Sequence, residues 1–131
     1  MSLRSSAFDN DLFALTLLTH DLEASRHFYG SLLGLSEVFT DDVCVIYKCG
    51  TTMINLLKLG AANDLAAPAQ VGAPSEVSAV YTLKFADIDA LANDLVKAGI
   101  ALLNGPQDQP WGVRTLCVQD PSGHVWEFAN H

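Results

Sequence analysis

Glu127 is the residue whose type and setting most suggest chemistry. It interrupts an otherwise apolar stretch, Val125 to Ala129. A carboxylate in such surroundings must find a partner, because an unpaired buried charge is very costly. Two interpretations follow. Glu127 either orients a ligand or acts as a general base, or it is a structural carboxylate bonded to Asn55, a threonine or water.

A second group of useful side chains lies between Trp111 and Arg114. Trp111 can flank a planar or apolar ligand, and Arg114 can pair with an anionic one. The alternatives are that Trp111 closes the core and Arg114 forms an ion pair with an acidic residue. Tyr47 is a candidate pocket wall, with core packing as its alternative.

The other reactive side chains form no motif. None of the four histidines stands at metal-ligand spacing from another, so we expect solvated or hydrogen-bonded imidazoles. The three cysteines form no CxxC pair, and Cys44 and Cys117 lie in apolar stretches typical of core thiols. Motifs of nucleotide-binding proteins and serine hydrolases are absent.

Composition limits the class of protein. The 131 residues carry fifteen acidic and seven basic side chains, a net charge of −8, which argues against nucleic-acid binding. The apolar runs are too short for a membrane span, and residues 1–10 lack the apolar stretch of a signal peptide. The odd number of cysteines favours a reducing, cytoplasmic location. We expect a single domain over residues 11–131 after an N-terminal arm.

The elements that must position these residues are repeated. ALTLLTHDLEA (14–24) and VYTLKFADIDA (80–90) share threonine, leucine, aspartate and alanine at matching places. A repeated strand-to-helix unit predicts two similar modules. We place module one at residues 11–59, a linker rich in Ala, Gly and Pro at 60–78, and module two at 79–131.

Each module is predicted to run strand, helix and three strands, an α+β fold. Asp21 and Asp87 are placed to cap the two helices, and Gly34 and Gly99 to end them. A loop is expected over 104–112 and a turn at 120–123. The predicted strands are 12–18, 35–40, 43–48, 52–59, 81–85, 100–103, 113–118 and 125–129.

This order resembles the glyoxalase, bleomycin-resistance and extradiol-dioxygenase superfamily, also called vicinal oxygen chelate proteins. The matching stretches are DLEASRHFYGSLLGL (21–35), DIDALANDLVKAG (87–99) and WGVRTLCVQDPSGHVWEF (111–128). The resemblance implies two βαβββ modules whose curled mixed sheets surround a cleft, and a homodimer. In metal-dependent members, the first and fourth strands of each module supply His, Glu or Gln ligands. The metal activates a substrate with adjacent oxygens, or dioxygen.

By this resemblance, the four ligand positions fall at Ala14, Asn55, Val80 and Glu127. Only Glu127 is a usual ligand, because aliphatic side chains have no donor atom and an amide oxygen binds transition metals weakly. We therefore expect no cofactor, and a divalent metal is disfavoured. Strand alternation places Thr16 and Thr82 on the same faces as the ligand positions.

Three functions follow. The first is binding of a small apolar or amphipathic molecule without metal, by Asn55, Trp111, Arg114, Thr16, Thr82 and Tyr47. The second is a lyase, isomerase or dioxygenase-type enzyme with a degenerate metal site, in which Glu127 is the catalytic residue. The third is a structural or regulatory module whose cleft is unused.

Overall fold

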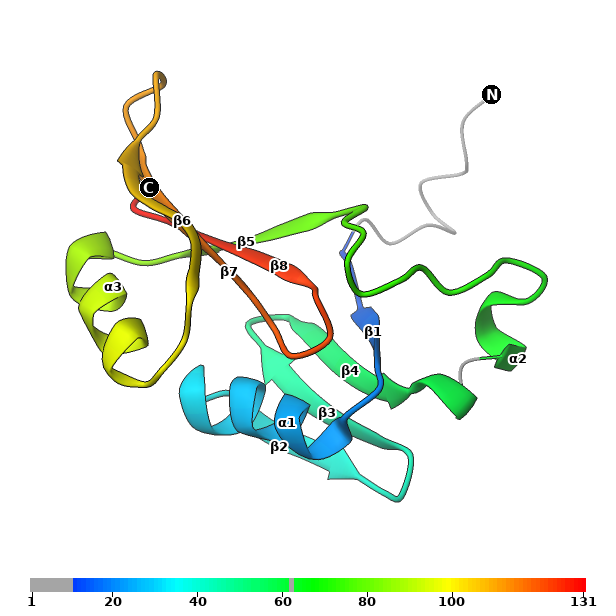
Figure 1. Cartoon of the computed structure of the whole chain (residues 1–131). Helices are drawn as coiled ribbons and strands as arrows, with labels where there is room; N and C mark the ends of the chain where they lie inside the picture. Colours follow the sequence, from blue (N-terminus) through cyan, green and yellow to red (C-terminus); the bar gives the residue numbers. More distant parts are fainter. Residues whose placement is uncertain (1–10, 62) are drawn as a thin grey trace. The chain divides into compact units, whose positions relative to one another are not determined.

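The computed structural model describes residues 11–61 and 63–131, and the chain divides into two compact units after Gln70. Each unit contains one four-stranded mixed sheet with a helix packed against it (Figure 1). The predicted α+β class and the repeated βαβββ order are confirmed.

The first sheet has the strand order β1-β4-β3-β2. Its strands are β1 (Ala14–Thr19), β2 (Ser36–Thr40), β3 (Cys44–Cys49) and β4 (Thr52–Lys58). β1 pairs in parallel with β4, and the other neighbours are antiparallel. The first and fourth strands of the module therefore lie side by side, as the helical crossover between β1 and β2 allows.

The helix of the first unit has two parts, α1 (Leu22–Arg26) and the π-helix η1 (His27–Leu32). It begins as predicted at Asp21, whose Oδ1 accepts a hydrogen bond from the backbone N–H of Ala24 at 3.0 Å. Gly34, with a φ of 72°, follows its end. The sequence predicted a single helix here, and its second half is π-helical, with Phe28 and Tyr29 buried.

The second sheet repeats this topology in the order β5-β8-β7-β6. Its strands are β5 (Val80–Lys84), β6 (Leu102–Asp108), β7 (Arg114–Gln119) and β8 (Val125–Ala129), and β5 is parallel to β8. The helix α3 (Ile88–Lys97) begins at Asp87, whose Oδ1 accepts from the N–H of Ala90 at 3.0 Å. It lies along β6 and β7 and buries the apolar side chains Ile88, Leu91, Ala92 and Leu95 (Figure 1).

Two segments differ from the prediction. The segment taken as an irregular linker, 60–78, begins within a 3-10 turn, η2 (Leu59–Ala61), and contains a short helix, α2 (Asn63–Ala66). Most of the loop predicted over 104–112 is strand, because β6 runs on to Asp108. The pairing of β6 with β7 shifts register on both sides of Asn104, and such irregular strands lack a clean alternating pattern.

Gly105 is required by the close approach of β6 to β7. Its φ is 80°, and a Cβ there would lie 2.5 Å from the carbonyl oxygen of Thr115 and 2.8 Å from Cα of Leu116. Both contacts are with backbone, which cannot swing away. Gly112, at the hairpin tip, has a similar φ of 88° but open space around its Cβ position.

These two glycines provide a matched test of the β6–β7 approach. Gly112→Ala should cost about 1–2 kcal/mol of unfolding free energy, the penalty of a left-handed backbone. Gly105→Ala should cost about 1–3 kcal/mol more, because the strands must also separate. Urea denaturation of both variants measures the difference. Equal losses would contradict the close approach.

Candidate functional site

Glu127 lies on the face of the second sheet that points away from α3. Its neighbours Trp126 and Phe128 are buried on the other face, opposite Val118 and Leu116. Arg114 shares that other face and bonds to Asp89 of α3, which identifies it as the helix side. We call the opposite side of each sheet its helix-distal face.

Glu127 is paired with Thr82 across β5 and β8. The two residues are direct partners in the register, and the Thr82 hydroxyl donates to Oε1 of Glu127 at 2.9 Å. Glu127 is partly buried and Thr82 is exposed. The hydroxyl fixes one carboxylate oxygen, and a carboxylate has room for further donors. A ligand with an N–H or O–H group can therefore bind here.

Asn55 and Thr16 form the equivalent pair in the first sheet. They are direct partners across β1 and β4, with Nδ2 of Asn55 3.5 Å from the Thr16 hydroxyl oxygen. Oδ1 of Asn55 is buried and has no hydrogen-bond partner among the described residues. The unsatisfied atom is therefore a hydrogen-bond acceptor.

The surroundings of Asn55 are apolar. Leu57, Cys44 and Ile46 lie on its face of the sheet, as the register of β4 with β3 shows. Together with two further side chains they form a hydrophobic cluster of Leu18, Cys44, Ile46, Leu57 and Ala61. The helix-distal face of the first sheet thus combines an apolar wall with one unsatisfied amide, the usual make-up of a small-molecule site.

Arg114 lies on the opposite face from Glu127, and its guanidinium is engaged. Nε and Nη2 donate to the two carboxylate oxygens of Asp89 at 3.1 and 3.0 Å, and Nη1 donates to Asp108 at 3.0 Å. These bonds raise the pKa of Arg114 and lower that of Asp89. The ion pair that the sequence left as the alternative is the arrangement found, and it joins β7 to α3.

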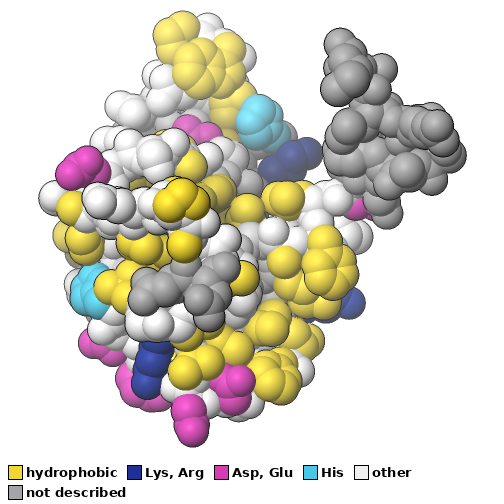
Figure 2. Space-filling view, turned by 90° about the vertical axis from the view of Figure 1, so that its right-hand side faces the viewer, with side chains coloured by type: hydrophobic (Ala, Val, Ile, Leu, Met, Phe, Trp, Pro, Cys, Tyr) yellow, Lys and Arg dark blue, Asp and Glu magenta, His cyan; other side chains and the backbone are white. Residues whose placement is uncertain are grey.

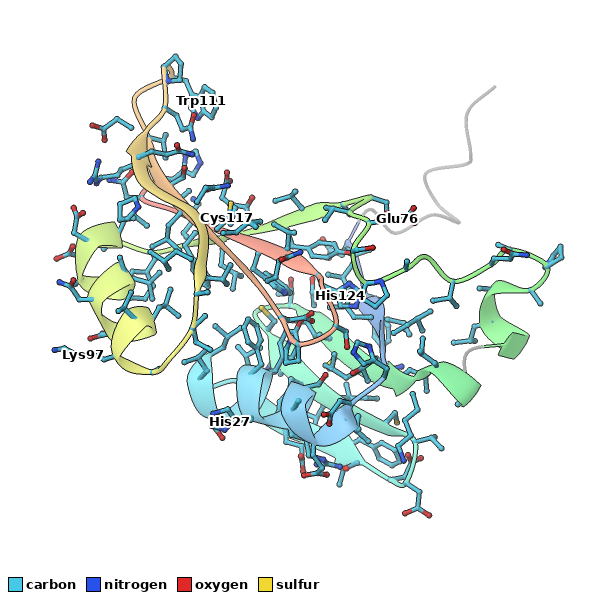
Figure 3. All side chains as sticks on the ribbon, viewed as in Figure 1. His27, Glu76, Lys97, Trp111, Cys117 and His124 are labelled. Atoms are coloured by element: carbon cyan, nitrogen blue, oxygen red, sulfur yellow. The ribbon has the colours of Figure 1, made fainter. Side chains whose placement is uncertain are left out.

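Neither Tyr47 nor Trp111 lies with the polar pair of its own unit. Tyr47 is buried on the helix side of the first sheet, where its ring stacks on Tyr29 with centroids 6.4 Å apart. Trp111 is 67% exposed at the tip of the β6–β7 hairpin (Figure 3). The sequence-predicted residues therefore separate into two pairs on helix-distal faces, one core tyrosine, one structural arginine and one exposed tryptophan.

Cys117 is a neighbour of Glu127 that the sequence analysis assigned only to the core. It is buried as expected, but it stands directly opposite Glu127 on the helix-distal face. Figure 3 shows it on β7, within the second sheet. Alternation along the strand pair would have found it only once the register of β7 against β8 was known.

A depression of about 470 Å³ lies elsewhere on the first unit. Two of its carboxylates already accept hydrogen bonds from backbone N–H groups. Asp21 caps α1, and Asp41 accepts from the N–H groups of Val43 and Cys44 at 2.9 Å. Those two bonds lower the pKa of Asp41. None of the predicted binding residues lines it; the lining is His20, Asp21, Leu22, Glu23, Arg26, Asp41, Asp42 and Lys58.

The donor set does not fit the four-ligand metal site that the resemblance implies. Ala14 and Val80, at the first-strand positions, have no donor atoms. Asn55 offers only its amide oxygen, and Oε1 of Glu127 accepts from Thr82. Within residues 11–61 and 63–131, no three His, Cys, Asp or Glu side chains converge as a metal centre would require.

Apolar side chains are prominent on the face of the molecule that Figure 2 displays. On the face displayed in Figure 2, apolar side chains reach the surface between acidic and basic ones. The exposed large apolar side chains come from both units and include Phe13, Phe39, Val80 and Trp111. Among the described residues, every helix is too short or too polar to cross a membrane.

Comparison with solved structures finds proteins of the same fold. Two crystal structures are similar to this chain. A glyoxalase-related enzyme from Fulvimarina pelagi has 27% identity and a TM-score of 0.79, and the match covers 92% of this chain and 87% of that one. A glyoxalase/bleomycin resistance protein/dioxygenase from Nocardioides has 25% identity and a TM-score of 0.80, and the match covers 93% of this chain and 83% of that one. Lactoylglutathione lyase from Agrobacterium tumefaciens, at 21% identity, a TM-score of 0.75 and coverage of 92% and 93%, shares the fold.

No curated protein sequence matches significantly. A sequence profile does match, over residues 12–128, nearly the whole of both modules. The chain therefore belongs to the glyoxalase/bleomycin resistance protein/dioxygenase superfamily.

Proposed function

We propose that this protein binds a small apolar or amphipathic molecule on the helix-distal faces of its sheets, without the metal of its metal-dependent relatives. The observation that carries the proposal is the unsatisfied amide of Asn55 beside an apolar cluster. A buried polar atom without a partner costs about 1–3 kcal/mol. A ligand with an apolar body and one hydrogen-bond donor removes that cost and covers the cluster.

The Glu127–Thr82 pair supports the same class of ligand. Its accepting groups are a carboxylate and a threonine oxygen, and Thr82 already directs its own proton to Oε1. The Arg114 guanidinium, which would favour an anion, is held on the other face by two carboxylates. A ligand with N–H or O–H groups therefore suits Glu127 better than an anionic one.

The alternative is a lyase, isomerase or dioxygenase-type enzyme in which Glu127 acts as the base. The hydrogen bond from Thr82 holds the carboxylate in one orientation, which suits proton abstraction by Oε2. This alternative uses the Glu127–Thr82 pair of the second sheet and requires turnover.

The predicted homodimer and the cytoplasmic location belong to the same proposal. β2 is an edge strand of the first sheet and is exposed along its whole length, so one row of its backbone groups is available for pairing. The described cysteines are all free, in keeping with a reducing compartment.

The first prediction concerns the metal. Protein purified without chelator should contain far less than one equivalent of zinc, iron, manganese or nickel, because two of the four expected positions lack donors. Elemental analysis measures this directly. A stoichiometric metal that is lost in Glu127→Gln would contradict the metal-independent proposal.

The second prediction concerns Asn55. N-phenyl-1-naphthylamine, an apolar probe with one N–H donor, should bind about five- to tenfold more tightly than 1-phenylnaphthalene, which lacks the donor. Asn55→Leu should remove this preference, because leucine keeps the bulk but not the acceptor. Asn93→Leu, at an exposed position of α3, is the control and should retain it. Fluorescence titration measures both affinities, and a preference that survives Asn55→Leu would refute the assignment.

The third prediction separates enzyme from binder. If the protein is catalytic, Glu127→Gln should lower kcat by about 10²- to 10⁴-fold with unchanged circular dichroism. Steady-state assays with α-oxo thiohemiacetal and catechol substrates measure this. Turnover that does not change in Glu127→Gln would exclude Glu127 as the base.

A further inference from the structure

A backbone contact in the second unit distinguishes its last turn from the equivalent turn of the first. Gly123, between β7 and β8, has a φ of 93°, and a Cβ there would overlap the carbonyl oxygen of Pro74 and lie 3.2 Å from its Cα. Around Gly50, between β3 and β4, no described atom lies within 4 Å of the Cβ position. We call residues 71–79, which contain Pro74 and lead into β5 (Figure 1), the strap.

The turn that contains Gly123 is fixed by its own hydrogen bonds. The N–H of Gly123 donates to the backbone oxygen of Asp120 at 3.0 Å, and its carbonyl oxygen accepts from Nε2 of Gln119 at 3.3 Å. The carboxylate of Asp120 is buried and accepts from the N–H groups of Ser122 and His124 at 2.9 Å. The turn therefore cannot easily move aside, and the strap lies against a firm backbone surface.

β5, the strand that follows the strap, is the edge strand of its sheet and lies beside β8. Its side chains alternate between exposed and partly buried, so packing contributes little to holding it. Beyond its C-terminal end, the N–H of Phe85 donates to the backbone oxygen of Ala129 at 2.9 Å. At its N-terminal end, Val80 pairs with Val125, which is two residues after Gly123. The strap therefore contacts the turn immediately next to the place where β5 begins to pair.

The contact at Pro74 shortens the free segment before the first pair of β5. Only residues 75–79 lie between Pro74 and Val80. Closing a loop costs chain entropy, and the cost is smaller when the chain is already held nearby. A turn within the strap, in which the N–H of Glu76 donates to the backbone oxygen of Ala73 at 3.0 Å, restricts the segment further.

We infer that Gly123 is a positioning residue of the Glu127 site, because by admitting Pro74 it holds the first half of β5 on β8. Thr82 is the third residue of β5, and its hydroxyl donates to Oε1 of Glu127 at 2.9 Å. That bond requires the two strands to be in register. The inference rests on the proposed function for the role of the Glu127–Thr82 pair, but the effect of the strap on β5 is measurable without any ligand.

The test compares Gly123→Ala with Gly112→Ala in the intact chain. Both glycines lie in hairpin turns of the second unit, with φ of 93° and 88°, so alanine introduces similar backbone strain. No described atom lies within 4 Å of the Cβ position of Gly112, so only Gly123→Ala displaces the strap. Hydrogen-exchange NMR should show the protected amides of residues 80–82 exchanging about tenfold faster or more in Gly123→Ala, and no faster in Gly112→Ala.

A second measurement on the same samples connects the strap to the site. The nuclear Overhauser effect between the Thr82 methyl group and the side chain of Glu127 should weaken in Gly123→Ala and keep its intensity in Gly112→Ala. A role of Gly123 in stability alone would speed exchange across the whole second unit and leave this signal unchanged.

Pro74→Gly makes the same test from the side of the strap, should Gly123→Ala fail to fold. Glycine keeps the carbonyl group but frees the dihedral that proline fixes, so the strap is held less firmly. Ala69→Gly, before the strap, is its control. Faster exchange confined to residues 80–82, with a weaker Thr82–Glu127 signal, would support the inference. Equal exchange in each variant and its control, an even increase over the second unit or an unchanged signal would overturn it, whether or not the probes of the proposed function bind.

Discussion

The parallel pairing of the first strand of each module with its fourth is the constraint on which the rest depends. Parallel strands need a crossover, and in both units a capped helix supplies it. The pairing sets Thr16 against Asn55 and Thr82 against Glu127. The polar pairs are thus products of backbone register, because the hydroxyl and its partner meet only where the first strand lies directly beside the fourth.

Much of the fold was predictable because its signals are local. Asp21 and Asp87 cap their helices through the N–H three residues on, and Gly34 and Gly99 follow the helix ends with positive φ. These features depend on neighbouring residues, so the sequence contains them directly. The internal repeat then predicted the second module from the first.

The site was predictable only in part, because it depends on non-local register. The family resemblance supplied the positions of Asn55 and Glu127, and alternation along single strands added Thr16 and Thr82, which the structure shows to be their register partners. It did not reveal that Arg114 points to α3 or that Tyr47 packs on Tyr29, since residue type alone does not tell which face is which. The course of β6 was out of reach altogether, because the register shifts on both sides of Asn104 leave no mark in the hydrophobic pattern.

The repeated threonine has a consequence for how the two halves diverge. In the first sheet the Thr16 hydroxyl faces an amide NH₂ as acceptor, while in the second the Thr82 hydroxyl donates to a carboxylate. A hydroxyl can play either part, because it has one proton and two lone pairs. The fourth-strand residue can therefore be a neutral amide in one module and a charged carboxylate in the other, while the residue beside it stays threonine. One duplicated scaffold is thereby compatible with two electrostatic characters, and the sites of its halves can specialise independently while their frameworks remain alike.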